Sequence, residues 1–159
     1  MRCCGGRDSR DDRRGVGRLR SGRRCTVRTV RPKKGLLLDT HVLVWVLVGS
    51  TRVGKRLQQA LVESDRVFYS PLSLAELQIK ERLGKFSGVD VVRRRSSQLE
   101  ALAFDVESAD AMRAENGGLP GDPFDQMLLA QATAHDCWFE TSDRRLLALE
   151  KSPCRNAEK

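Results

Sequence analysis

The sequence predicts an α/β fold in which helices cover a central parallel sheet. Short apolar runs of strand length alternate along the chain with segments of helical length. Alternation of this kind favours parallel strands that are joined by helical crossovers. A chain of 159 residues can form one such domain with a buried core.

Local signals justify the elements in chain order. An unbroken apolar run at 36–38 is typical of a strand buried in a parallel sheet. Ser73 can cap a helix that Gly84 ends, and Pro123 fits the first position of another helix. We predict strands at 36–38, 67–69, 102–106 and 137–140, and helices at 40–47, 54–64, 73–83, 91–100, 108–115, 123–135 and 143–149.

The amino-terminal segment differs in charge from the rest of the chain. Residues 1–35 hold 13 of the 29 Lys and Arg and 3 of the 21 Asp and Glu, a net charge of +10, whereas the remainder holds 16 against 18, a net charge of −2. We expect a disordered basic extension, either from a mis-assigned start or able to bind polyanions. We expect the folded domain at 36–150 and an irregular tail at 151–159.

Composition also bears on where the protein acts. The five cysteines are an odd number without a CxxC pair, which does not indicate a disulfide framework. The amino terminus lacks the apolar core of a secretory signal, and the most apolar run, at 42–48, is far shorter than the ~20 residues that span a bilayer. We therefore expect a cytoplasmic protein without a membrane role.

Four acidic residues lie where an apolar segment meets a turn or a helix start: Asp39, Glu76, Asp125 and Asp143. Asp39 and Asp143 each follow an apolar run, at the sheet edge where α/β proteins bind ligands. Asp125 shares a helix face with apolar residues, and Glu76 lies at the edge of one. The repeated position indicates that the four side chains meet in one site.

Each of these acids also has a purely structural explanation. Asp39 can cap the helix that follows it, and Asp122 is a natural N-cap before Pro123. Glu76 can pair with Lys80 four residues on, and Asp143 can interact with a helix dipole. Taken singly these explanations compete well, so the interpretation as a site depends on all four together.

Carboxylates that gather in one cleft need a counter-charge. A pair about 4 Å apart repels by about 4 kcal/mol at an effective dielectric of about 20. Hard oxygen ligands favour Mg2+ or Mn2+, whereas His41 and His135 are the only histidines and have no cysteine at zinc-ligand spacing. The pattern indicates a magnesium-dependent nuclease.

Four segments, LLLDTHVLVW, SPLSLAELQIKERLGK, LPGDPFDQMLLAQA and FETSD, resemble the PIN-domain family, most closely the VapC toxins of toxin–antitoxin pairs. The resemblance covers about residues 35–149 in the family's order and implies a PIN-like, Rossmann-like three-layer α/β/α sandwich. Thr141 matches a hydroxyl that precedes the last acid in many members, and Asp122 is frequent in this branch. The family's catalytic acids fall on Asp39, Glu76, Asp125 and Asp143.

The resemblance also implies an activity and partners. The four acids would hold one or two Mg2+ or Mn2+ ions and the protein would hydrolyse RNA phosphodiester bonds, with an antitoxin partner and a homodimeric assembly. Lys80, Lys85 and Arg144 are candidates for binding phosphate. Gln126 stands where many relatives have a basic residue, Ala75 where many have Trp, and the usual final apolar strand is missing.

Two other functions remain open. Asp39 at a strand end can be the phosphoacceptor of a receiver-like phosphotransfer module, which leaves Glu76 unexplained. A PIN fold that binds RNA or a partner without cutting is the second. The run Arg93, Arg94 and Arg95 can grip RNA, although a solvated helix face is the simpler explanation.

Overall fold

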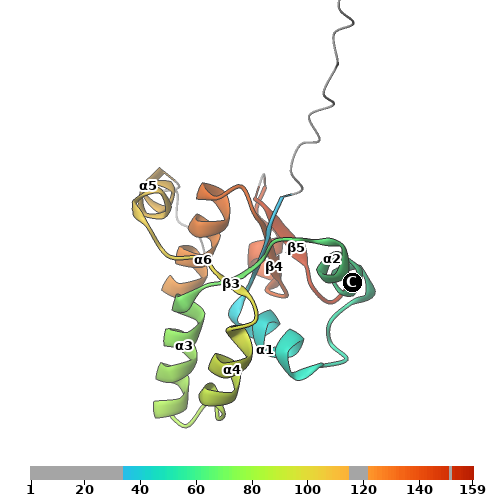
Figure 1. Cartoon of the computed structure of the whole chain (residues 1–159). Helices are drawn as coiled ribbons and strands as arrows, with labels where there is room; N and C mark the ends of the chain where they lie inside the picture. Colours follow the sequence, from blue (N-terminus) through green and yellow to red (C-terminus); the bar gives the residue numbers. More distant parts are fainter. Residues whose placement is uncertain (1–33, 115–121, 151) are drawn as a thin grey trace, which may run out of the picture. The chain divides into compact units, whose positions relative to one another are not determined.

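The central element of the fold is a parallel sheet. The computed structural model describes residues 34–114, 122–150 and 152–159. Within them the chain forms a five-stranded sheet in the order β3-β2-β1-β4-β5, and all neighbouring strands are parallel (Figure 1). The strands are β1 (Leu36–Leu38), β2 (Val67–Tyr69), β3 (Glu100–Ala101), β4 (Trp138–Thr141) and β5 (Cys154–Asn156). The predicted α/β class with a central parallel sheet is confirmed.

Helices provide the connections between the strands. Ser70 and Asp122 each accept a hydrogen bond from the backbone N–H two residues on, and a proline begins the helix after each of them. Gly49, with φ of 69°, ends the first helix in the left-handed conformation that glycine favours. The helices of the described residues are α1 (Thr40–Val48), α2 (Lys55–Glu63), α3 (Pro71–Arg82), α4 (Val89–Ser96), α5 (Val106–Ala114), α6 (Pro123–Ala134) and α7 (Arg144–Leu147).

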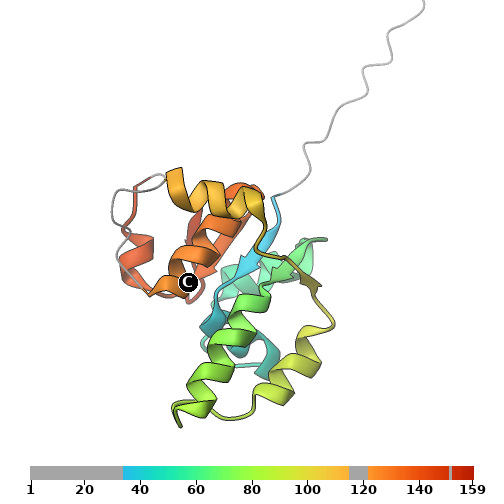
Figure 2. The same cartoon turned by 90° about the vertical axis from the view of Figure 1, so that its left-hand side faces the viewer.

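Two apolar clusters show that helices cover both faces of the sheet. Neighbouring residues of a strand point to opposite faces, and Leu37 and Leu38 are both fully buried. Leu38 packs with side chains from α1 to α4, whereas Leu37 packs with side chains from α6 and α7. Figures 1 and 2 show α5 beside α6 and α3 beside α4. The expected three-layer sandwich is confirmed.

The strand order creates a switch point between β1 and β4. From β1 the chain passes to β2 and β3 on one side, and from β4 it passes to β5 on the other. Connections that leave two adjacent strands in opposite directions open a crevice at their carboxyl ends, where open α/β sheets bind ligands. Asp39 directly follows β1, and Asp143 lies two residues beyond the end of β4.

Several boundaries differ from the sequence prediction, and local capping decides two of them. The predicted strand at 102–106 is wrong: the strand is β3, and Asp105 instead accepts hydrogen bonds from the backbone N–H and hydroxyl of Ser108, at the start of α5. Ser73 does not cap α3. Ser70 does, because Pro71 fits the first helical position.

The prediction of an irregular tail at 151–159 is wrong over residues 154–156. These residues form β5, which pairs with β4, and Ala157 beyond it is fully buried. Pro153 lies just before the strand, where its missing N–H removes no ladder hydrogen bond, and its carbonyl accepts one from Phe139. Backbone pairing therefore completes the sheet although the segment is poor in apolar side chains. Of the basic extension predicted at 1–35, residues 1–33 lie outside the described residues.

Candidate active site

A cleft of about 480 Å3 opens at the carboxyl ends of β1 and β4. The basic residues that line it are Arg52, Lys80 and Arg145. The acidic residues that line it are Asp39, Glu76, Asp122, Asp125, Asp143 and Glu158. The four acids singled out from the sequence therefore line one cleft, at the switch point of the sheet.

Asp39 is the least exposed of these acids. Its exposed fraction is 3%, and its Oδ2 accepts a hydrogen bond of 2.6 Å from the hydroxyl of Thr141. Burial raises the pKa of Asp39, and the bond from Thr141 opposes that rise. The same hydroxyl accepts a hydrogen bond of 3.1 Å from the backbone N–H of Asp143. Thr141 thus joins the acids that follow β1 and β4.

Glu76 enters the cleft from α3. It is 5% exposed, and its Oε2 accepts a hydrogen bond of 2.5 Å from the hydroxyl of Thr40. Its other oxygen forms an ion pair with Lys80, one helical turn further on. The carboxylate is therefore held by two partners, and Lys80 is committed to it.

Asp125 lies in the first turn of α6, and its surroundings strongly perturb its pKa. Its pKa is raised to about 6, first because the side chain is partly buried and then because Asp39, Glu76, Asp122 and Asp143 are close enough to repel its negative charge. Mutual repulsion among these carboxylates is the property that a bound cation would relieve. Asp122 accepts a hydrogen bond from the Phe124 N–H, as expected of an N-cap.

Asp143 is held by Arg145. The guanidinium contacts both carboxylate oxygens, with Nη2 at 2.7 Å from Oδ2, and the backbone N–H of Arg145 donates to Oδ1 at 2.8 Å. The side-chain hydrogen bond from Arg145 is the largest cause that lowers the pKa of Asp143. Asp143 also caps α7 in this way, so the predicted structural role and the position in the cleft coexist.

A family model of the PIN domain matches residues 36–152. The chain belongs to the PIN-domain family. Ribonuclease VapC22 of Mycobacterium tuberculosis is 28% identical to the chain over 115 residues, which are 70% of the chain and 88% of that protein. This agrees with the resemblance drawn from the sequence motifs.

Solved structures of the same fold come from toxin–antitoxin complexes. The DNA-bound VapBC of Salmonella typhimurium gives a TM-score of 0.59 at 22% identity, covering 77% of this chain and 98% of that chain. VapBC2 of Rickettsia felis, bound to a DNA fragment from its promoter, gives 0.57 at 17% identity, covering 76% and 97%. At these identities the likeness concerns the PIN fold. The receiver-like alternative loses its support, because the fold belongs to a different family.

The PIN fold brings most of the predicted site residues together. Asp122 and Lys80 line the cleft with the four acids, and Thr141 contacts it through Asp39. Lys85 and Arg144, the other candidates for phosphate binding, are absent from the lining. Sequence reasoning missed Arg145, which lies two residues beyond Asp143 and just outside the segment FETSD.

Three further lining residues had no local signal in the sequence. Trp45 and Arg52 belong to α1 and to the turn that follows it, and Glu158 lies after β5. Arg52 and Glu158 meet because β5 joins the sheet, which the sequence did not predict. A correct prediction of β5 would have brought Glu158 to the edge of the sheet that carries Asp39.

His135 and the arginine run lie outside the cleft, whereas His41 lies in it. His135 pairs with Asp105 at 2.9 Å and caps the carboxyl end of α6, ~16 Å from its first turn. His41 lines the cleft, so the two histidines do not form a joint zinc site in the described structure.

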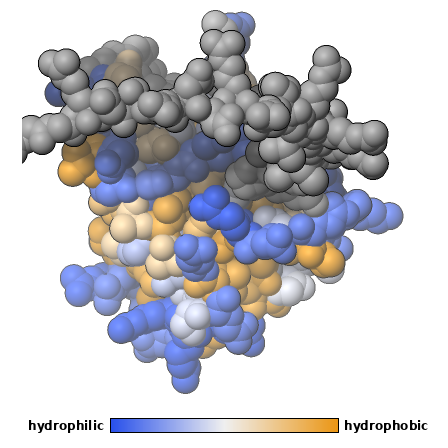
Figure 3. All heavy atoms as spheres, turned by 45° about the horizontal axis from the view of Figure 1, so that its top comes forward, coloured by the Kyte–Doolittle hydropathy of each residue, from blue (hydrophilic) through white to orange (hydrophobic). Residues whose placement is uncertain are grey.

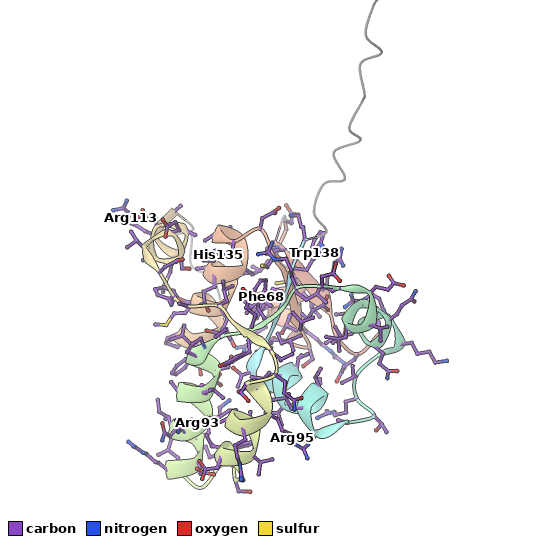
Figure 4. All side chains as sticks on the ribbon, in the orientation of Figure 1. Phe68, Arg93, Arg95, Arg113, His135 and Trp138 are labelled. Atoms are coloured by element: carbon purple, nitrogen blue, oxygen red, sulfur yellow. The ribbon has the colours of Figure 1, made fainter. Side chains whose placement is uncertain are left out.

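The arginine run lies on α4. Arg95 donates to the Leu47 carbonyl, and Figure 4 shows Arg93 and Arg95 extending from α4.

The donor atoms of the cleft are of the kind that hard divalent cations prefer. Its acids supply carboxylate oxygens, and the pKa values of Asp39 and Asp125 are raised in part by neighbouring carboxylates. In the described residues no three His, Cys, Asp or Glu side chains converge closely enough to enclose an ion. Thr40, Thr141 and the basic partners hold the carboxylates in the conformations described above.

Proposed function

We propose that this PIN domain is a metal-dependent endoribonuclease and acts as the toxin of a toxin–antitoxin pair. The observation that carries the proposal is the cluster of Asp39, Glu76, Asp125 and Asp143 in one cleft at the switch point, with the pKa of Asp125 raised to about 6. Structural carboxylates have no need to be placed where they repel one another, whereas a cation-binding centre does. The name of the mycobacterial relative, a ribonuclease, supports RNA as the substrate.

The roles of the acids follow from their surroundings. Asp39 and Asp125 would be the principal ligands of Mg2+ or Mn2+, because both are partly or fully buried and, among the described residues, neither forms an ion pair with a Lys or Arg side chain. Glu76 and Asp143 would ligate through water or orient the attacking water, since Lys80 and Arg145 already balance their charge.

A bound divalent cation would supply a nucleophile by lowering the pKa of bound water and would offset charge on the phosphate oxygens. The chain's own residues prepare that site. Thr141 fixes the Asp39 carboxylate by donating its hydroxyl proton to Oδ2. Arg145 restricts Asp143 to one orientation through several hydrogen bonds.

The antitoxin, the homodimer and a cytoplasmic location complete the proposal. Similar folds occur in structures of VapBC complexes, which supports a protein partner. Large apolar side chains remain exposed on α3 (Ile79), directly after it (Leu83) and on α4 (Val91). Figure 3 shows one face where apolar side chains reach the surface between charged ones. No helix among the described residues has the length and apolarity to cross a membrane.

The test is a cleavage assay with the full chain. Labelled structured RNA is incubated with Mn2+, with Mn2+ and excess chelator, and with two variants. Asp39→Asn removes a principal carboxylate, and Asp65→Asn is the matched control because Asp65 is exposed and lies outside the cleft. We expect cleavage by the wild type and by Asp65→Asn in Mn2+, and a loss of at least about 100-fold for Asp39→Asn.

A folded wild type that leaves RNA intact in Mn2+ would contradict the nuclease proposal. The remaining function would then be a PIN fold that binds RNA or a partner without cutting, since the basic partners already neutralise Glu76 and Asp143 in the structure. Cleavage that survives in chelator would contradict the metal dependence alone.

A further inference from the structure

Arg52 differs from the other two cations of the cleft in its availability. Lys80 is paired with Glu76, and Arg145 is bonded to both oxygens of Asp143. Arg52 reaches its nearest carboxylate, that of Glu158, only at 4.0 Å, and its side chain is 64% exposed. Within the described part of the chain, the guanidinium makes no hydrogen bond. Arg52 is therefore the cleft cation that an incoming anion can bind without breaking a close ion pair.

Trp45 holds this guanidinium in a defined place. The guanidinium carbon of Arg52 lies 4.6 Å from the centroid of the Trp45 ring, within the range of a cation–π contact, and both residues line the cleft. A guanidinium stacked on a ring keeps its N–H groups free at the edge, in the fork that matches two phosphate oxygens. The ring thus lowers the cost of ordering an otherwise mobile, exposed side chain.

The carboxyl end of the chain fixes the turn that carries Arg52. The Gly54 N–H donates to the Ala157 carbonyl at 2.8 Å, and a Cβ on Gly54 would overlap the backbone of Glu158 and Lys159. Figure 1 shows this end of the chain beside α2. The close approach of these backbones sets Glu158 against Arg52 at the rim of the cleft.

A polyanionic substrate needs such a cation here. The cleft is lined by six carboxylate side chains, and two of its three cations are already neutralised by them. We infer that Arg52, oriented by Trp45, binds a backbone phosphate of the RNA that flanks the phosphate to be cut, and that Glu158 is its counter-ion in the free protein. This inference rests on the proposed ribonuclease function and names a substrate-binding group for it.

The first test measures steady-state cleavage of a short single-stranded RNA by full-length Arg52→Gln. KM is expected to rise about tenfold, equivalent to about 1.4 kcal/mol, with kcat within about twofold, because the contact is made equally in the bound and transition states. The slope of log KM against log salt concentration is expected to fall by about 0.7, the value for one lost phosphate contact on a single strand.

Two further variants are expected to change KM in opposite directions. Glu158→Gln removes the counter-ion, so KM is expected to fall below that of the wild type. Trp45→Leu removes the platform but keeps Arg52, so KM is expected to rise by less than in Arg52→Gln while the salt slope is retained. Thermal unfolding of each variant establishes that the protein is folded in the assay.

The matched control is Arg66→Gln. Arg66 also lies over an aromatic ring, 5.1 Å from the centroid of Phe68, but at the amino-terminal end of β2, away from the cleft. Its KM and salt slope are expected to match the wild type. An unchanged KM and slope in Arg52→Gln, with the wild type cutting RNA, would overturn the inference and leave the proposed function intact.

A binding measurement distinguishes failure of the Arg52 contact from failure of the proposed ribonuclease function. Fluorescence anisotropy of labelled RNA is recorded with Asp39→Asn, which is not expected to cut, and with the Asp39→Asn and Arg52→Gln double variant. Weaker RNA binding and a smaller salt slope in the double variant support the Arg52 contact even if the wild type proves inactive. Equal binding by the two proteins overturns the contact whatever the wild type does.

Discussion

At the scale of single residues, one hydroxyl joins the acids that follow β1 and β4. Thr141 donates to Asp39 and accepts from the backbone of Asp143. We expect Thr141→Val to lower the free energy of unfolding by about 1–3 kcal/mol, because a buried carboxylate loses its donor. Thr133→Val is the control, since Thr133 is exposed and its hydroxyl donates to the Leu129 carbonyl within α6, and its effect should stay within about 0.5 kcal/mol. Equal urea denaturation midpoints for the two variants would contradict this role.

The acids also make stability depend on pH. The folded-state pKa of Asp125 is about 6, above the ordinary 3.8 of an unfolded Asp, so the folded protein binds more protons than the unfolded chain between these values. The contribution of this group to stability therefore falls as pH rises from about 4 to about 6. In chelator, we expect the Tm of Asp125→Asn relative to the wild type to increase over that interval. A Tm difference that is independent of pH would contradict a raised pKa of Asp125 in the folded protein.

At the scale of elements, an ion pair between Arg56 and a buried glutamate ties α2 to the last two strands. Glu140 of β4 is fully buried and accepts hydrogen bonds from the guanidinium of Arg56, which also donates to the Asn156 carbonyl of β5 at 2.9 Å. Arg56→Met should destabilise the fold by about 3–5 kcal/mol, because it leaves a buried charge unpaired. Adding Glu140→Gln should recover part of that loss in denaturant unfolding. A double variant no more stable than Arg56→Met would argue against the pairing.

The same elements show what could be predicted from the sequence. β1 and α6 have strong local signals, an unbroken apolar run and a capped Pro123, and the structure agrees with both. β5 has none, because its backbone pairs with β4 through residues that are only partly buried. The prediction of a strand at 102–106 was wrong because Asp105 caps the start of α5 with its carboxylate, and this local hydrogen bonding prevails over the strand tendency of a short apolar run.

At the scale of the whole molecule, the meeting of the four acids could be predicted from the sequence, whereas the contact between Arg52 and Glu158 could not. Asp39 and Asp143 could be placed together because parallel strands end at one edge of the sheet, a rule that needs no contact information. Arg52 and Glu158 meet only once β5 has joined that sheet, about 100 residues after the turn that carries Arg52. Long-range contacts of this kind leave no period or spacing in the sequence.

The central claim is that the carboxylate cleft is a divalent-cation centre. Isothermal titration of the full chain with Mn2+ at about pH 6, where Asp125 is still partly protonated, in two buffers with different ionisation enthalpies, tests it most directly. The account predicts that the wild type binds Mn2+ and releases protons, since burial and neighbouring carboxylates raise the pKa values of Asp39 and Asp125. Asp39→Asn should bind at least about tenfold more weakly. A wild type that binds no Mn2+, or binds it as weakly as Asp39→Asn, would contradict the claim.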